Sequence, residues 1–319
     1  MNRFVLSFIV LVALLAGCKK TDDPTNAQPK TISDLLTETP TFSLLRAAVQ
    51  QAGMADALKG AQLTLFAPTD DAFKAAGFST PESFQNVSAD QLKAILRYHL
   101  ITGAVSTKTP EVAGATNVAV EAGDKKILFV TNSADGLFVN GTRVTQPDQV
   151  VANGFVHTIG KVLMPPAADV VSAVKLRTDL SLLSAAVARA ATVRPDLLTI
   201  LNGTTTNANL RQITVFAPND AAFAAAGYRT VADINAAPAA TLANILTYHA
   251  VQGYVFSNQL KVGQLTTLNS SANNKITLAL TNNALTVKGN SNAVAATIKE
   301  ADIVSGNAVI HVIDQVLLP

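Results

Sequence analysis

The sequence is poor in several residue types on which common functional sites depend. Tryptophan is absent, and aromatic residues make up only 5% of the 319 residues. Carbohydrate-binding clefts often use exposed aromatic platforms, so this scarcity counts against a conventional lectin or glycosidase. Charged residues make up 14%, with 24 Lys and Arg against 22 Asp and Glu, and no basic run stands out. Nucleic acid is therefore not expected as a partner.

Catalytic and metal-binding motifs are also missing from the sequence. The single cysteine, Cys18, excludes an intrachain disulfide and a thiolate metal cluster. There is no Gly-x-Ser-x-Gly elbow, no phosphate-binding glycine loop and no His-Glu-x-x-His motif. We therefore expect no cofactor, no metal and no enzymatic activity.

What the chain does contain is enough apolar material for globular cores. Hydrophobic residues make up 49% of the sequence, a composition typical of folded domains and not of disordered chains. Domains commonly have about 100–200 residues, so the length predicts two of them.

The longest apolar run, residues 4–16, follows Arg3 near the N-terminus. It is too short to span a bilayer and has the pattern of a secretory signal. It ends in Leu15-Ala16-Gly17-Cys18, which resembles a bacterial lipobox, a signal that is cut before the cysteine and acylated on it. We expect residues 1–17 to be a signal peptide and Cys18 to carry the membrane anchor, each buried methylene contributing about 0.8 kcal/mol. A plain signal peptide with an incidental cysteine is the alternative.

Residues 18–30 read as a polar tether with two prolines. Lys19 directly after the cysteine argues, by resemblance to known sorting rules, against retention in the inner membrane. The cluster Lys19–Asp23 also resembles surface-export signals of some Gram-negative bacteria. We expect an outer-membrane lipoprotein facing the cell surface, with a periplasm-facing orientation as the alternative.

The rest of the chain repeats itself. Tyr98-His99 matches Tyr248-His249 at an offset of 150, and residues 63–77 match residues 213–227 with ten of fifteen positions identical. The sequence thus predicts one domain duplicated, with domains at residues 31–165 and 166–319. An insertion in the second copy, around residues 194–209, contains Asn202-Gly203 and is expected to be a surface loop.

Each copy reads as helices followed by strands, which predicts α+β domains. Ser88 and Gln91 form a candidate capping box at the start of a helix. The apolar stripe of that helix is Leu92, Ile95 and Leu96, repeated as Leu242, Ile245 and Leu246. Residues 127–130 form a continuous apolar strand candidate, and Asn140-Gly141 is expected to be a turn.

Three ordered motifs in each copy resemble the fasciclin domain family. Residues 64–73 and 214–223, which share Phe-Ala-Pro-x-Asp, look like its first signature block, and the Tyr-His pairs sit where that family carries its Tyr-His motif. Residues 307–314 resemble its second block, and residues 153–160 are a looser copy. The resemblance implies a wedge-shaped β-sandwich with helices packed along one edge, and a role in adhesion or surface contact.

The resemblance also implies candidate contact residues. Family members have been credited with receptor contacts around an Asp-Ile dipeptide and around the Tyr-His region. The matching residues are Tyr98, His99, Tyr248, His249, Asp302 and Ile303. The first copy has Asp148-Gln149-Val150 in place of Asp302-Ile303-Val304, which puts that contact role in more doubt there. The alternative for the histidines is a buried, hydrogen-bonded structural role.

The Phe-Ala-Pro-x-Asp motif has a structural interpretation. The proline ends a strand because it cannot donate a ladder hydrogen bond. Asp70, and Asp220 in the second copy, then lies in the first turn of the next helix, where a negative charge is favourable. Phe73 and Phe223 are expected to fill the core.

The sequence as a whole predicts a non-enzymatic adhesion or interaction protein, held in the membrane by its acyl anchor. Its expected partner is a surface protein, a matrix or a polysaccharide. The alternative is a lipoprotein that binds a glycan or small ligand for an uptake system, or an envelope scaffold. An enzyme is the third and least favoured interpretation.

Overall fold

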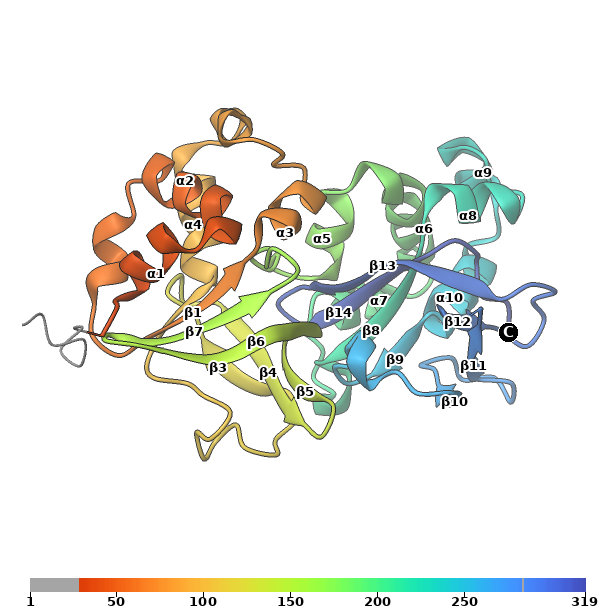
Figure 1. Cartoon of the computed structure of the whole chain (residues 1–319). Coiled ribbons are helices and arrows are strands. Elements are labelled where there is room, and N and C mark those ends of the chain that lie inside the picture. The colour runs from red at the N-terminus through yellow and green to blue at the C-terminus, as the bar shows by residue number, and fades with distance from the viewer. Residues whose placement is uncertain (1–28, 283) are drawn as a thin grey trace, which may run out of the picture.

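The computed structural model describes residues 29–282 and 284–319, which form two similar domains side by side (Figure 1). In the view of Figure 1, most of the helices lie toward the top of the molecule and most of the strands toward the bottom. The expected signal peptide, Cys18 and residues 18–28 of the expected tether lie outside the described residues. Among the described residues, none of the helices has the length and apolar character needed to cross a bilayer.

The first domain begins with helices and ends with strands. Its α-helices are α1 (Ile32–Glu38), α2 (Ser43–Gln51), α3 (Asp70–Ala75) and α4 (Ala89–Tyr98). Its strands are β1 (Leu63–Pro68), β2 (Leu100–Thr102), β3 (Val118–Glu121), β4 (Ile127–Ser133), β5 (Gly136–Val139), β6 (Thr142–Val151) and β7 (Gly154–Ile159). Short 3-10 helices occupy Pro40–Phe42, Ala55–Lys59 and Pro81–Asn86.

The second domain repeats this order with additional helices. Its α-helices are α5 (Val170–Lys175), α6 (Ser181–Ala191), α7 (Pro195–Leu201), α8 (Asp220–Ala225), α9 (Val231–Ala236) and α10 (Ala239–Tyr248). Its strands are β8 (Ile213–Pro218), β9 (Ala250–Gln252), β10 (Gly263–Thr266), β11 (Lys275–Thr281), β12 (Ala284–Lys288), β13 (Ala296–Val304) and β14 (Ala308–Ile313). Its 3-10 helices are Thr178–Leu180, Ala208–Leu210 and Ser257–Gln259.

Both sheets have the same topology. The first runs β2-β1-β7-β6-β5-β4-β3, and the second, read from the equivalent edge, runs β9-β8-β14-β13-β12-β11-β10. Each sheet has one parallel pair, β1 with β7 in the first and β8 with β14 in the second, and all other neighbouring strands are antiparallel. The predicted duplication and the predicted α+β class are therefore confirmed.

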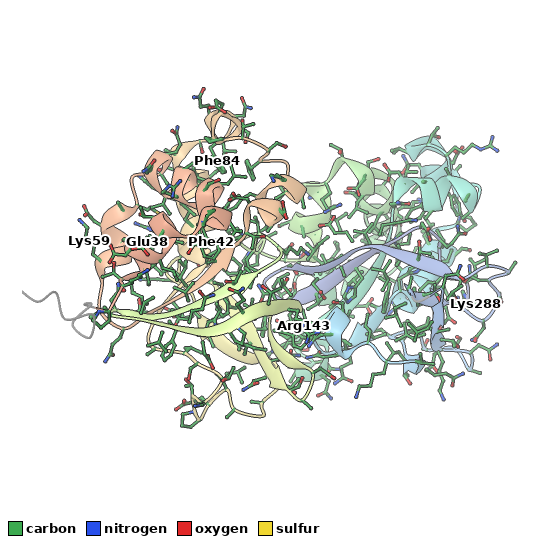
Figure 2. All side chains as sticks on the ribbon, viewed as in Figure 1. Glu38, Phe42, Lys59, Phe84, Arg143 and Lys288 are labelled. Atoms are coloured by element: carbon green, nitrogen blue, oxygen red, sulfur yellow. The ribbon has the colours of Figure 1, made fainter. Side chains whose placement is uncertain are left out.

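Each sheet separates two apolar cores. All six residues of β1 are buried. Because successive residues point to opposite sides of a strand, both faces of β1 are covered. Leu65 packs with Phe73 and the helices, whereas Phe66 packs with Tyr98 and Leu128 between the two halves of the folded sheet. Figure 2 shows the buried Phe42 and Phe84 within the helical layer and the charged ends of Lys59 and Lys288 at the periphery.

The signature motif connects two helices in each domain. Asp70 lies in the first turn of α3, as predicted, but its carboxylate also accepts hydrogen bonds from Ser43 Oγ at 2.6 Å and from the Leu44 amide at 2.8 Å. It therefore satisfies an amide at the start of α2 that the helix itself leaves unpaired. Asp220 accepts the same two bonds from Ser181 and Leu182 in the second domain.

Several local predictions are confirmed. Ser88 and Gln91 form a reciprocal capping box at α4, and the apolar stripe behind it is buried. Phe73 and Phe223 are each 1% exposed. Residues 127–130 belong to β4, and Asn140-Gly141 turns the chain between β5 and β6 with φ of 46° and 73°.

The expected surface loop at residues 194–209 is wrong in its first half. Residues 195–201 form α7, with Pro195 at its start, and bury Leu197, Ile200 and Leu201 in the second core. Proline is favoured at the first helical position, and residues three and four apart share one helical face. This apolar spacing outweighs the turn signal of Asn202-Gly203, which applies only after the helix ends.

Candidate functional site at the domain junction

The two Tyr-His pairs are interior residues. Tyr98 and Tyr248 are fully buried, and His99 and His249 are each 1% exposed. The pairs close α4 and α10, whose apolar faces carry them into the core. The structural alternative from the sequence is what the structure shows, and the pairs present no surface to a partner in this conformation.

Each of these histidines fastens the segment that follows the last strand of its domain. His99 Nδ1 donates to the Ile95 carbonyl at 2.8 Å, and its Nε2 accepts from the Leu163 amide at 2.9 Å. His249 repeats the pattern with Ile245 and Leu317, both at 2.8 Å. Because an amide can only donate, a second ring proton would face another donor. The imidazoles are therefore held neutral.

Burial reinforces this preference. Removal from water lowers the pKa of His99 and of His249 to about 4, against 6.5 for the free side chain, although the hydrogen bond to the backbone carbonyl acts in the opposite direction. The Tyr98 hydroxyl is also bound inside the domain, since it donates to the Ile127 carbonyl at 2.8 Å and accepts from the Asn140 amide at 2.9 Å. These side chains therefore form hydrogen bonds that connect separate segments of the fold.

The other two histidines support an unusual backbone turn in each domain. Asp148 and Asp302 have φ of 56° and 64°, and each lies in an irregular stretch of its strand, β6 or β13. The amide of Asp148 donates to His157 Nδ1 at 3.0 Å, and that of Asp302 donates to His311 Nδ1 at 3.3 Å. Both imidazoles are fully buried. The histidine thus stabilises a conformation that non-glycine residues seldom adopt.

The aspartate carboxylates also bind backbone in their own domains. Asp302 accepts from the Ser257 amide at 2.7 Å and from the Ser257 hydroxyl, and Asp148 makes the same pair of bonds with Thr107. The carboxylates differ in exposure, because the side chain of Asp148 is 27% exposed and that of Asp302 only 7%.

The extra burial of Asp302 comes from the neighbouring domain. The Asn140-Gly141 turn of the first domain packs directly on its carboxylate, so that a Cβ built on Gly141 would lie 2.4 Å from Asp302 Oδ2. Ile303, the other predicted contact residue of this dipeptide, is half-buried and lines a hollow at the same junction. Asp302 thus faces the first domain, whereas Ile303 also packs against the core of its own domain, and their role toward an external partner stays a prediction.

An aromatic cluster forms the centre of the junction. Phe129 of β4 packs against Tyr254 and Phe256 in tilted geometry, with ring centroids 4.7 and 5.7 Å apart and interplanar angles of 52° and 47°. Val304 and Val309 complete this cluster from the second domain. Aromatic contacts of this kind add about 0.5–1.5 kcal/mol beyond the area they bury.

Polar contacts fix the orientation of the two domains. The amides of Asn117 and Gln259 exchange hydrogen bonds at 2.6 and 3.2 Å, and Asn117 also donates to the Tyr254 carbonyl. Lys161 of the first domain donates to the Ala301 carbonyl at 2.8 Å. These directional bonds and the aromatic cluster together join the two domains.

Sequence reasoning missed these junction residues, although a signal for them exists. Equivalent backbone bonds align Val105 with Val255, so that Ala104 and Ser106 stand where the second copy has Tyr254 and Phe256. An aromatic residue that is present in only one copy of a duplicated domain indicates a contact surface that only this copy has.

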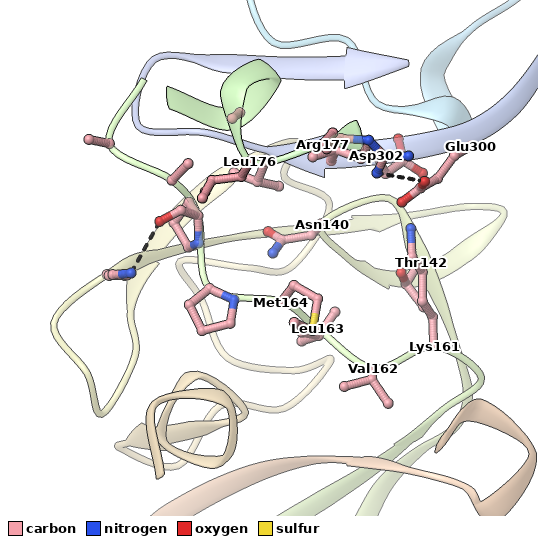
Figure 3. A pocket seen from close by; sticks show the side chains of 18 residues that line it. Asn140, Thr142, Lys161, Val162, Leu163, Met164, Leu176, Arg177, Glu300 and Asp302 are labelled. Carbon is pink, nitrogen blue, oxygen red and sulfur yellow. Dashed lines mark hydrogen bonds and ion pairs between the residues drawn. The ribbon is translucent and has the colours of Figure 1, made fainter. Parts of the chain in front are cut away.

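A hollow of about 550 Å³ lies beside the aromatic cluster, between the domains (Figure 3). The linker 162–168 forms one wall, with apolar side chains of Leu163 and Met164, and Leu176 and Ile303 contribute from the second domain. A second hollow of about 380 Å³ shares Lys126, residues 166–168 and Val304 with the first. Within the described part of the chain, no three His, Cys, Asp or Glu side chains gather closely enough to hold a metal ion.

The charges around the larger hollow are unevenly matched. Arg177 is paired with Glu300 at 2.8 Å (Figure 3) and with Asp179 at 2.9 Å. Lys126 and Lys161 bind only the carbonyls of Pro166 and Ala301, at 3.1 and 2.8 Å, and neither is paired with a carboxylate among the described residues. The junction therefore joins apolar walls to two lysines, Lys126 and Lys161, that form no ion pair within the described part of the chain.

Comparison with known proteins agrees with the fold. The fasciclin domain profile matches residues 40–165 and 184–319. Protein sll1483 of Synechocystis sp. is 34% identical over 139 residues, covering 43% of this chain and 74% of that protein. Human periostin is 26% identical over 259 residues, 80% of this chain and 28% of periostin. Cell surface glycolipoprotein MPB83 of Mycobacterium bovis is 34% identical over 114 residues, 36% of this chain and 49% of that protein.

The chain thus spans less than half the length of periostin and about half that of MPB83. Among solved structures, a fasciclin domain pair from the insect cell adhesion molecule fasciclin I matches with a TM-score of 0.37 and 17% identity, covering 86% of this chain and 96% of that one. The profile covers most of this sequence and falls once on each of the two domains. The chain belongs to the fasciclin domain family.

Proposed function

We propose that this protein is a non-enzymatic, lipid-anchored surface protein of a Gram-negative bacterium that attaches to a protein, matrix or polysaccharide surface. The observation that carries this proposal is the duplicated fasciclin domain, with its two copies in contact at the junction. A relative named as a cell surface glycolipoprotein supports display at the surface. The lipobox at Cys18 supports the anchor.

The two domains offer different surfaces for attachment. In the second domain, the edge at Asp302-Ile303 is covered by the first domain. The equivalent edge of the first domain is open, and Val150 at that edge is 78% exposed, whereas Val304 is 8% exposed. Within the pair, this edge is therefore accessible to an external partner on the first domain and covered on the second. We therefore place the attachment face at residues 148–150, although the resemblance pointed to the second copy.

Display is tested on intact cells by protease shaving and antibody labelling, comparing the wild type with Cys18→Ala. Labelled wild type with unlabelled Cys18→Ala supports a lipid-anchored surface protein. Protection of the wild type until the outer membrane is broken would exclude contact with other surfaces.

Attachment is tested by binding purified chain to matrix proteins and polysaccharides. Val150→Asp is expected to weaken binding about tenfold, because it puts a charge into an apolar contact. Val294→Asp is the matched control, since Val294 is 67% exposed on the second domain. Equal losses in both variants would show that residues 148–150 are not the face, and no binding above a blank surface would contradict attachment itself.

A second candidate function is binding of a small ligand. The junction hollow of about 550 Å³ favours it, because small-molecule sites have volumes of about 300–1,000 Å³ and prefer domain interfaces.

A further inference from the structure

The two hollows at the junction share one charged side chain. Lys126 lines both of them, and among the described residues it is the only charged one that lines the smaller hollow. Its ammonium donates to the Pro166 carbonyl at 3.1 Å, which leaves two further donors free. This holds a positive charge at the boundary of the two hollows without neutralising it.

The walls around this charge are apolar. The smaller hollow is lined by Ile127, Phe129 and Tyr254, together with alanines of the linker. The larger is lined by Met164 and Leu176, which are 56% and 80% exposed. Exposed apolar side chains that converge on one hollow gain free energy when a ligand covers them, at about 25 cal/mol per Å².

Negative charges are confined to one end of the site. Asp302 and Glu300 line the larger hollow only, where Asp302 is bound by Ser257 and Glu300 by Arg177. Neither lines the smaller hollow. An anion placed on Lys126 at the smaller hollow therefore has its counter-ion beside it and no carboxylate among the lining residues.

We propose that the junction binds an amphipathic anion, an aliphatic chain with a carboxylate head. The head binds the Lys126 ammonium, and the chain lies along the apolar walls of the hollows. Such a ligand matches both features of the site, since a neutral hydrocarbon would leave Lys126 without an anion and a small anion would leave the walls uncovered. This inference rests on the second candidate function and is independent of attachment through residues 148–150.

The test is calorimetric titration of the full chain with decanoate, in the Cys18→Ala background so that no acyl group at that position competes. Decan-1-ol is the neutral control and acetate is the head without a chain. Decanoate is expected to bind saturably and at least about tenfold more tightly than decan-1-ol. Added NaCl is expected to weaken its binding, since part of the attraction is between charges at a solvent-accessible site. Acetate is expected to show no saturation.

Three variants locate the site. Lys126→Glu and Leu176→Glu are each expected to weaken decanoate binding by about tenfold or more, because the first reverses the head contact and the second charges the wall. Lys125→Glu is the matched control, because Lys125 is exposed in the same turn and lines neither hollow. Circular dichroism melting is expected to be the same in all three, since these side chains are on the surface.

Several outcomes would overturn the inference. These are equal binding of decan-1-ol and decanoate, an equal loss in Lys125→Glu and Lys126→Glu, or no saturable binding of decanoate. The failure of this inference and that of the proposed function are distinguishable. Lys126→Glu is expected to attach to surfaces as the wild type does, and Val150→Asp to bind decanoate as the wild type does.

Discussion

The two domains share their internal bonds and differ on the surfaces that meet. Three hydrogen bonds recur with nearly the same lengths in both copies. They are accepted by the carboxylate of Asp70 or Asp220, by His99 or His249, and by His157 or His311. The junction, by contrast, differs between the copies. The carbonyls of Ile127 and Lys275 accept the equivalent tyrosine hydrogen bond, so these two residues align. Phe129 of the first domain then aligns with Thr277 of the second.

This difference makes the pair directional. One side of the first domain carries Phe129 and Asn117, and the facing side of the second carries Tyr254, Phe256 and Gln259. Neither copy has both sets, so neither can substitute for the other at the junction. A duplicated domain can therefore keep one folding scaffold while its two surfaces become specialised, and the following predictions test that separation.

The largest effect is expected from truncating the phenylalanine that occupies the equivalent core position in each domain. Phe73→Ala and Phe223→Ala are each expected to destabilise their own domain by about 3–5 kcal/mol, since each removes a buried ring at an equivalent place. Differential scanning calorimetry measures the change. One domain melting early while the other keeps its transition would show that the junction adds little cooperativity. A single lowered transition in both variants would show strong coupling.

A second large effect is expected on acidification. The unfolded chain binds the histidine proton below pH 6.5, whereas folded His99 and His249 bind it only near pH 4. The stability that neutral histidine contributes is therefore complete above pH 6.5 and is lost as the pH falls through 4, by about 3 kcal/mol for each side chain.

Urea unfolding at pH 7.5 and at pH 4.5 measures this loss. His99→Gln and His249→Gln are the comparison variants, because they remove one titrating group at a time while keeping a polar side chain. Each is expected to show a smaller loss on acidification than the wild type. An unchanged pH dependence in either would mean that its histidine titrates normally.

The copies also differ in tolerance at one backbone position. Gly154 has φ of 147°, and a Cβ added to it would lie 1.8 Å from the Leu63 carbonyl oxygen, whereas the equivalent residue of the second domain is Ala308. Gly154→Ala is expected to destabilise the first domain by about 3 kcal/mol. Ala308→Gly is the control and is expected to cost about 1 kcal/mol. Equal, small changes in chemical denaturation would show that β1 and β7 can separate to admit the methyl group.

The smallest effect is expected at the junction. Phe129→Ala removes the ring that packs against two aromatic side chains, and is expected to weaken domain docking by about 1–2 kcal/mol while leaving each domain folded. Thr277→Ala is the matched control. Small-angle scattering would report a wider distribution of domain orientations for Phe129→Ala only. The same distribution in both variants would show that the amide pair of Asn117 and Gln259 suffices.

The sequence predicted what depends on local pattern. Helical stripes, the capping box at Ser88 and the Asn140-Gly141 turn all follow from residues close together in the chain. The same logic failed at α7, where a turn signal was extended back over a helix that begins at Pro195.

The site depends on contacts that local pattern does not contain. Asp302 is buried because Gly141, in the other domain, packs against it, and no spacing within either copy indicates that contact. The Tyr-His pairs show the opposite error, since the resemblance suggested a contact site at the surface, whereas the side chains are buried in the cores. Position-by-position comparison of the copies would have found Phe129, Tyr254 and Phe256, because each is aromatic in one copy only.

The junction has a mechanical consequence. Helix α1 and the C-terminal end lie at opposite ends of the molecule, so tension between them passes through the Pro165-Pro166 linker and the contacts beside it (Figure 1). Those contacts are side-chain stacks and a few hydrogen bonds, whereas each domain is held by a continuous sheet, so we expect the junction to part first. Single-molecule stretching would then record a short step before either domain unfolds, and its absence would contradict this. Parting would uncover Asp302 and Ile303, so a pulled molecule would present side chains that a relaxed one keeps covered.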